Sequence, residues 1–145
     1  MKRHIDRIEG ANYERGYVYN FHYHLIWVTK YRRQVFTTPG LIKEMKDILC
    51  ETAERNGITV EAVEVMPDHI HMMISFKPKM AATSAVKALK GRSARRFFEL
   101  HPDVKKDKFW GGHLWSNSYY MGTTGKMSSD VVQRYIENQY VKSQE

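Results

Sequence analysis

The sequence predicts an α+β fold in which an antiparallel sheet carries both main helices on one face, with a further helix at the C-terminus. Two observations predict it. Runs that alternate with a period of two and runs with helical spacing follow one another as strand, helix, strand, strand, helix, strand, helix. In addition, 145 residues, 42% of them hydrophobic and 27% charged, are typical of one globular domain. We therefore expect residues 1–145 to form a single domain, with tails at about 1–18 and 140–145.

The first strand and the first helix are marked by their patterns. Residues 21–30 place apolar and aromatic side chains on one face and a mixture with histidines on the other, which predicts a central strand. A helix should follow, because Thr38 can cap it, Pro39 can open it, and Asn56 and Gly57 can close it.

Two further strands should pair as a hairpin. Residues 58–66 are rich in β-branched side chains, and residues 69–76 alternate between apolar and other side chains. Pro67 and Asp68 between them are typical turn residues.

The second half repeats the helix and strand pattern. A helix is expected over about 81–100, a strand over 113–121 that ends at the Gly-Thr-Thr-Gly stretch 122–125, and a last helix from Ser128 or Ser129 to about 140. This order is that of the ferredoxin-like or RRM-like split βαβ fold with an added C-terminal helix. It leaves one face of the sheet open.

Composition excludes several classes of protein. Cys50 is the single cysteine, so no internal disulfide can form, and we expect an intracellular, cytoplasmic protein. No stretch approaches the roughly 18 apolar residues of a membrane span, so we expect no membrane partner.

The positive charge is concentrated in one segment. The formal net charge is +7, and residues 77–108 hold ten lysines and arginines against three acidic residues, which equals the whole excess. A solvated, lysine-rich surface is one interpretation of such a run. A surface that follows the phosphates of a nucleic acid is the interpretation we favour.

Two histidines share the face of a strand that should not face the core. Ile70, Met72 and their alternating neighbours are apolar and should face the helices, so His69 and His71 should share the opposite face. Alternate strand residues lie about 6.6 Å apart, and two imidazoles at that spacing can hold one divalent ion. Such a pair needs a third ligand.

The C-terminal helix can supply further groups. Tyr135 and Gln139 are four residues apart, so both side chains lie on one face of a helix. By itself this spacing equally suits a core tyrosine and a solvated glutamine.

Together these motifs resemble a known family. The His69-Ile70-His71 strand, the basic middle helix and a C-terminal helix bearing Tyr135 and Gln139 are similar to the single-tyrosine HUH transposases of the bacterial insertion-sequence 200/605 family. The similarity lies in segments 19–33, 65–71, 115–120 and 135–139 and spans more than four-fifths of the chain.

The resemblance implies an enzyme that cleaves and rejoins single-stranded DNA at the ends of an insertion sequence. It implies that His69 and His71, helped by Gln139, bind Mg²⁺ or Mn²⁺, and that Tyr135 attacks a phosphodiester to give a 5′-phosphotyrosine and a 3′-hydroxyl. A phenol with a pKa near 10 needs such activation, and the covalent link preserves the energy needed for rejoining.

The resemblance also implies partners. It implies a homodimer with composite active sites in which Tyr135 works in trans, with Gly122 and Gly125 in the hinge. It further implies recognition of subterminal DNA hairpins by a protein associated with the nucleoid. We expect the phosphate contacts to come from the basic helix, at Lys87, Lys90, Arg92, Arg95 and Arg96. Aromatic platforms could come from Tyr31, Trp110 or Trp115.

Alternatives remain at the level of the sequence. A non-catalytic RRM-like nucleic-acid-binding module would share the fold, but it would present aromatic residues where His69 and His71 stand. A relaxase, a replication initiator or a domesticated HUH nuclease acting on repetitive palindromes would share the chemistry. A zinc hydrolase fits less well, because no third histidine or acid has the usual spacing of zinc ligands.

Overall fold

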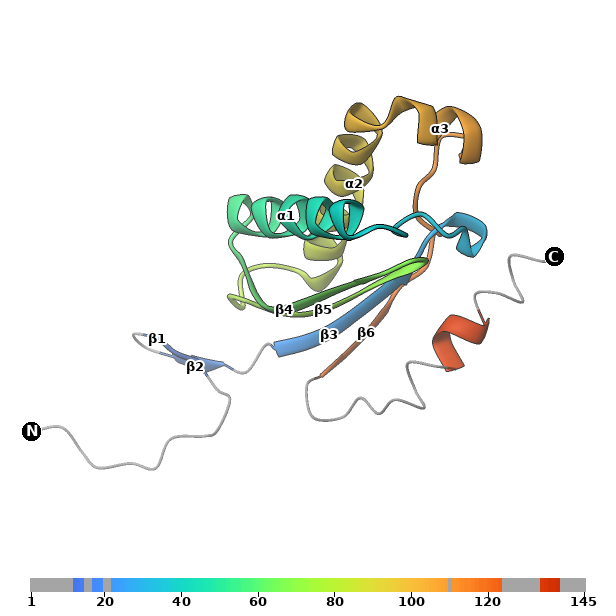
Figure 1. Cartoon of the computed structure of the whole chain (residues 1–145). Coiled ribbons are helices and arrows are strands. Elements are labelled where there is room, and N and C mark those ends of the chain that lie inside the picture. The colour runs from blue at the N-terminus through green and yellow to red at the C-terminus, as the bar shows by residue number, and fades with distance from the viewer. Residues whose placement is uncertain (1–11, 15–16, 20–21, 110, 124–133, 139–145) are drawn as a thin grey trace, which may run out of the picture.

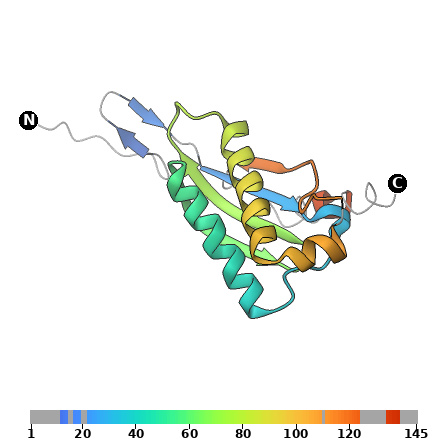
Figure 2. The same ribbon diagram turned by 90° about the horizontal axis from the view of Figure 1, so that it is seen from above.

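The main sheet is antiparallel, with strand order β4-β5-β3-β6. The structure, a computed structural model, describes residues 12–14, 17–19, 22–109, 111–123 and 134–138. The strands of this sheet are β3 (His22–Val28), β4 (Ile58–Met66), β5 (His69–Phe76) and β6 (Tyr120–Thr123). Helices α1 (Pro39–Arg55) and α2 (Ala82–Leu100) cover one face (Figures 1 and 2). The predicted split βαβ fold is confirmed.

The ends of α1 show why the sequence folds as it does. The side chain of Thr38 accepts a hydrogen bond from the backbone N–H of Leu41 at 3.2 Å, and Pro39 is the first residue of the helix. Gly57 follows the helix with a φ of +70°, a conformation that costs glycine little. The capping signals therefore place both ends of α1 where the sequence predicted them.

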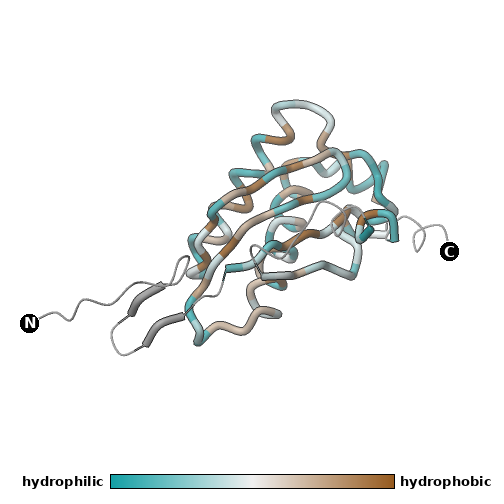
Figure 3. Tube along the Cα trace, turned by 90° about the horizontal axis from the view of Figure 1, so that it is seen from below, coloured by the Kyte–Doolittle hydropathy of each residue, from teal (hydrophilic) through white to brown (hydrophobic). Residues whose placement is uncertain are grey.

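The core lies between the helices and one face of the sheet. The alternating positions Leu25, Trp27, Ile70, Met72 and Ile74 are fully buried there. They pack in one cluster with side chains of α1 and α2, such as Met45, Leu49, Leu89 and Phe97. The alternation of apolar positions along the strands is visible from the other side of the sheet in Figure 3. The period of two thus decided which face of β3 and β5 became the core.

The last strand of the sheet is later than predicted. The sequence indicated a strand over 113–121, whereas β6 spans Tyr120–Thr123 and most of the earlier residues form a loop. Leu114 and Trp115 are buried in the main core, and the Trp115 indole N–H donates to the Ser93 hydroxyl at 3.0 Å. Two buried side chains that fix the loop to the core therefore gave this segment an apolar pattern similar to that of a strand.

Three short elements complete the described chain. Helix α3 (Pro102–Lys108) was missed, because its apolar residues are too few to show a helical period, although Pro102 and Asp103 are helix-start signals. Strands β1 (Asn12–Glu14) and β2 (Tyr17–Tyr19) pair within what we expected to be a tail. A 3₁₀ turn, η1 (Lys30–Arg32), follows β3.

The C-terminal helix is described in part. Residues 134–138 are helical, while the remainder of the predicted helix lies outside the described residues. In Figure 1 this segment lies on the side of the sheet opposite α1 and α2. None of the helices described here is long and apolar enough to cross a membrane.

Candidate active site

His69 and His71 lie on the face of the sheet that points away from α1 and α2. Ile70 and Met72, their alternating neighbours in β5, are fully buried in the main core, whereas both histidines are part-exposed. The predicted sharing of one face by the two imidazoles is therefore what the structure shows.

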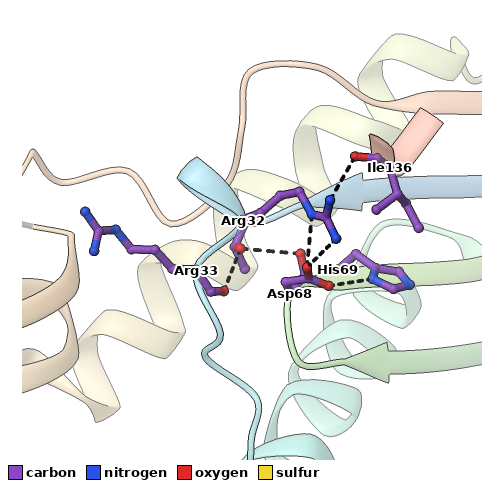
Figure 4. A network of polar contacts seen from close by, with 6 residues as sticks. Arg32, Arg33, Asp68, His69 and Ile136 are labelled. Atoms are coloured by element: carbon purple, nitrogen blue, oxygen red, sulfur yellow. Dashed lines mark hydrogen bonds and ion pairs between the residues drawn. The ribbon is translucent and has the colours of Figure 1, made fainter. Parts of the chain in front are cut away.

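The turn before β5 orients the first histidine. The Nδ1 atom of His69 lies 2.8 Å from Oδ1 of Asp68, which is buried in the turn between β4 and β5 (Figure 4). A carboxylate at Nδ1 fixes the ring and its tautomer, so Nε2 is the nitrogen that can bind a metal ion. Asp68 was predicted as a turn residue, and its contact with His69 was not foreseen.

The second histidine contacts a third one from the neighbouring strand. His24 of β3 approaches His71 with its Nδ1 atom 3.0 Å from Nε2 of His71, and the ring centroids are 5.2 Å apart. Burial, followed by the neighbouring His24, lowers the pKa of His71 below its usual value. A neutral imidazole is the form that binds a cation, so His71 is prepared as a ligand near neutral pH.

Arg32 connects the turn η1 to the same site. Its Nε and Nη2 atoms each lie 3.0 Å from Oδ2 of Asp68. The hydrogen bond with His69 and the Arg32 charge hold the pKa of Asp68 below its usual value, against the opposing effect of burial. Tyr31 and Arg32 both have positive φ angles, 58° and 51°, a conformation that is strained for non-glycine residues.

Tyr135 lies on the same sheet face as the two histidines. Its hydroxyl is 3.1 Å from the Ser118 hydroxyl, and its ring centroid is 6.1 Å from that of Tyr120. Tyr120 pairs with Ile26, which pairs with His71 on its other side, so these three side chains share one face. Burial raises the pKa of Tyr135 above its usual value.

One end of the sheet face that the sequence predicted to be open is buried. Ile26 and Val28 lie on the histidine face yet are fully buried, and they fall outside the main core cluster. Ile136 is also buried, and its carbonyl oxygen accepts from Nη1 of Arg32 at 3.4 Å. The expectation of an open face is therefore wrong at this end, where apolar side chains on the histidine face are fully buried.

Two predicted residues fall outside the described chain, and one has a different local role. Gln139 and Gly125 are not among the described residues. Gly122 lies inside β6 opposite His24, where a Cβ atom would come within 2.9 Å of the Tyr120 hydroxyl oxygen. The ring of Tyr120 therefore explains this glycine without a hinge, and the hinge role of the stretch 122–125 stays a prediction.

The predicted DNA-binding residues line α2. Lys87, Arg95 and Arg96 are exposed and Arg92 is part-exposed. Lys90 is different, because its ammonium donates to the carbonyl oxygens of Ser116 at 2.7 Å and Ser118 at 3.1 Å. Burial lowers the pKa of Lys90 to about 8. Lys90 thus holds the loop that carries the hydroxyl partner of Tyr135.

The residues predicted as aromatic platforms also differ in their exposure. Tyr31 is 55% exposed, whereas Trp115 is 6% exposed and belongs to the core. Trp115 as a platform was therefore wrong. Trp110 lies outside the described residues.

The described residues supply part of a metal site. Among them, no group of three or more His, Cys, Asp or Glu side chains is arranged to hold an ion. The two imidazoles of His69 and His71 suit a divalent cation, one ring being oriented by a carboxylate and the other being kept neutral. The set fits such an ion if further oxygen ligands come from elsewhere, as predicted for Gln139.

Comparison with known proteins shows first a similar fold and then the family. The fold is similar to the structure of a REP-associated tyrosine transposase bound to a REP hairpin, which aligns with a TM-score of 0.52 at 13% identity, covering 90% of this chain and 71% of the other. Residues 17–139 match the family described as "Transposase IS200 like". The chain belongs to this IS200-like transposase family.

Relatives with higher identity agree. The ISDra2 transposase TnpA of Deinococcus radiodurans is 48% identical over 129 residues, which cover 88% of this chain and 90% of that protein. The transposase for insertion sequence element IS200 of Salmonella typhimurium is 33% identical over 121 residues, covering 83% and 78%. A crystal structure of a candidate transposase from Deinococcus radiodurans aligns with a TM-score of 0.81 at 45% identity, covering 89% and 98%.

Proposed function

We propose that this IS200-like transposase cleaves and rejoins single-stranded DNA at insertion-sequence ends, with Tyr135 as the nucleophile. The observation that carries the proposal is the sharing of one sheet face by His69, His71 and Tyr135. The tyrosine oxygen forms a bond to phosphorus, and the bond from phosphorus to the 3′ oxygen breaks. The products are a 5′-phosphotyrosine and a 3′-hydroxyl, and attack by a 3′-hydroxyl on the phosphotyrosine reverses the step and joins strands.

The surroundings of Tyr135 indicate that its phenol must be deprotonated and held in position for attack. Because burial raises its pKa, the phenol is neutral near pH 7 and has to lose its proton during attack. The Ser118 hydroxyl, 3.1 Å away, holds the phenol oxygen in place. His69 and His71, with Gln139, would hold Mg²⁺ or Mn²⁺, which when bound polarises the scissile phosphate.

The test is the covalent adduct. Purified protein is incubated with labelled single-stranded hairpin DNA, with and without Mn²⁺ or Mg²⁺, and analysed on a denaturing gel. We expect a protein–DNA adduct that requires the ion and is absent from Tyr135→Phe. Tyr23→Phe is the matched control, because Tyr23 stacks on Phe76 on the core side of the sheet at 5.4 Å. An adduct that persists in Tyr135→Phe would remove the nucleophile from the proposal.

Two cavities lined partly by basic residues offer sites for the single strand. One cavity of about 280 Å³ is lined by residues of η1 and of the segment that follows α2: Lys30, Tyr31, Arg33, Lys108, Phe109, Gly111 and His113. A second, of about 450 Å³, shares His113 and includes Lys87 and Lys90 of α2. Cationic groups of Lys30 and Arg33 lie 5.3 and 5.5 Å from the Tyr31 ring centroid. Phosphates and a stacked base suit this combination.

These two cavities predict where single-stranded DNA is held. Tyr31→Ala should weaken binding of a hairpin with a single-stranded extension about tenfold and leave the bare hairpin unaffected, as loss of one stacked base would. Neutralising Arg92 and Arg95 should weaken both and flatten the dependence on salt. An unchanged salt slope would show that these two arginines do not contact phosphates.

We also propose that two copies form composite active sites, with Tyr135 acting in trans. In the single chain, the segment 134–138 is hydrogen-bonded to Arg32 of η1 and to Ser118 of the loop before β6. Exchange of this segment between two copies would make the same contacts in trans. Mixing His69→Ala protein with Tyr135→Phe protein should then restore part of the cleavage. Complete absence of restoration would count against action in trans.

A further inference from the structure

The guanidinium of Arg32 joins two parts of the site, the turn before the histidine strand and the tyrosine segment. On one side it donates through Nε and Nη2 to Oδ2 of Asp68, and on the other through Nη1 to the carbonyl oxygen of Ile136 (Figure 4). The second acceptor belongs to the residue directly after Tyr135. The Arg32 side chain therefore links the turn that precedes the histidine strand to the segment that carries Tyr135.

Asp68 extends the connection to a proposed metal ligand. Its two carboxylate oxygens are used separately: Oδ2 accepts from Arg32, and Oδ1 lies 2.8 Å from Nδ1 of His69. The carboxylate cannot rotate to improve one contact without disturbing the other. The orientation of the His69 ring and the position of the Arg32 fork are consequently linked through a single buried group.

The backbone around this pair is held firmly. The Thr29 N–H donates to the carbonyl oxygen of Asp68 at 2.9 Å, and the Thr29 hydroxyl donates to the Arg33 carbonyl oxygen at 2.8 Å. Thr29 itself is fully buried. Arg32 is held at a φ of 51°, which is costly for a residue with a Cβ atom and persists where the surrounding contacts impose it. These contacts present Arg32 toward Asp68.

The neighbouring arginine does not share this role. The side chain of Arg33 points away from the network in Figure 4, and its guanidinium lies over the rings of Tyr31 and Phe109 at 5.5 and 5.9 Å. Two adjacent residues of the same charge thus have different surroundings: Arg32 is part-exposed and bonded to a buried carboxylate, and Arg33 is exposed on the surface. Charge alone does not explain the placement of Arg32.

We infer that Arg32 and Asp68 form a coupling clamp, in which seating of the tyrosine segment and orientation of His69 for metal binding stabilise each other. The catalytic meaning of the clamp rests on the proposed function, whereas the coupling itself does not. Both residues are positioning residues. Because such a coupling is reciprocal, loosening either end should loosen the other. The clamp would act equally on a segment supplied by a second copy of the chain.

Crossed measurements on the full chain test the coupling. Mn²⁺ alone, without DNA, is titrated to obtain its dissociation constant, and hydrogen exchange reports the protection of the amides of residues 134–138. Arg32→Lys keeps the charge but loses the fork, so it should loosen the segment and also weaken Mn²⁺ binding about tenfold, because the Asp68 carboxylate that orients His69 would lose its paired donors. Asp68→Asn should weaken Mn²⁺ binding and also speed exchange at 134–138, because Arg32 would lose the carboxylate that holds its fork in place.

Controls separate the clamp from general loss of stability. Arg55→Ala removes an exposed arginine that forms an ion pair with Glu51 on the surface of α1, so neither measurement should change. Exchange in the core strand β5 reports whether each variant keeps its fold; should Asp68→Asn lose it, Asp68→Glu, which retains the charge but displaces it, takes its place with the same expectation. In the folded variants, kcat of cleavage should fall more than KM changes, because the clamp orients groups already present.

The outcomes are distinguishable. If Arg32→Lys alters only the segment while Asp68→Asn alters only Mn²⁺ binding, the two contacts are independent and the clamp is overturned. If the unaltered protein does not bind Mn²⁺, the metal part of the proposed function fails together with that arm of the clamp. Faster exchange at 134–138 in Asp68→Asn would then still establish the link to the tyrosine segment, and unchanged exchange would exclude it.

Discussion

On the helix-covered face of the sheet, Leu25 and Ile70 are fully buried and pack against apolar side chains of α1 and α2. On the other face, one residue along each strand, His24 and His71 contact each other and remain part-exposed. The first face is held by nonpolar burial, which tolerates exchange between side chains of similar volume. The second depends on directed contacts between particular atoms. Stability should therefore reside in the first face and chemistry in the second.

The largest expected effect comes from adjacent residues of β5. Ile70→Ala should lower the free energy of unfolding by about 2 to 5 kcal/mol, because it empties a fully buried site. His71→Ala should change stability little while lowering adduct formation at least about 100-fold. Denaturant unfolding and the adduct assay, applied to both variants, measure the contrast. Equal losses of stability would contradict the division between the two faces.

A smaller effect is expected from a pair of glycines. At Gly122 a Cβ atom would displace the ring of Tyr120, against which Tyr135 packs, so Gly122→Ala should reduce cleavage about 3- to 10-fold. At Gly91 in α2 nothing lies within 4 Å of such an atom, so Gly91→Ala should raise stability by about 0.5 to 1 kcal/mol. Thermal unfolding and the adduct assay report both. A fully active Gly122→Ala would show that the ring contact does not position Tyr135.

The smallest effect is a dependence of stability on pH. In the folded state, burial and the neighbouring His24 lower the pKa of His71 below its ordinary value of 6.5. Near and below pH 6.5 the unfolded chain therefore binds a proton at His71 more readily than the folded chain does. The free energy of unfolding should therefore fall as the pH decreases through this range. His71→Gln should make the fall shallower, whereas Ile70→Val should leave its slope unchanged. Parallel slopes in the parent and His71→Gln would exclude His71 as a source.

Much of the fold could be predicted because its signals are local. The caps of α1, the alternation of β5 and the turn at Pro67 and Asp68 each lie within a few residues of the element they mark. The strand predicted at 113–121 failed for the same reason, since Leu114 and Trp115 are apolar for contacts with distant parts of the chain. A short window cannot distinguish an anchored loop from a strand.

Some residues of the candidate site could likewise be predicted from the sequence, and others could not. His69 and His71 could be found because both lie in one strand with a clear core face, and Tyr135 was recognised from its motif. His24 lay on the correct face of its own strand, but its approach to His71 required knowing that β3 and β5 are neighbours. The contact of Asp68 with His69 had a signal in the sequence, because the two residues are adjacent, but an aspartate in a turn is first interpreted as a turn residue. Arg32 carried none that distinguishes it from Arg33.

By itself the sequence determined the order of elements, the core face of the central strands and the side on which His69 and His71 lie. The tertiary structure alone decided that His24 contacts His71, that the carbonyl oxygen of Ile136 accepts from Arg32, and that Arg32 bonds to Asp68 while Tyr31 is exposed. The physical reason is the range of the forces involved. Periodic burial is set by residues two to four positions apart, whereas strand order and a strained turn are fixed by contacts between segments far apart in the chain.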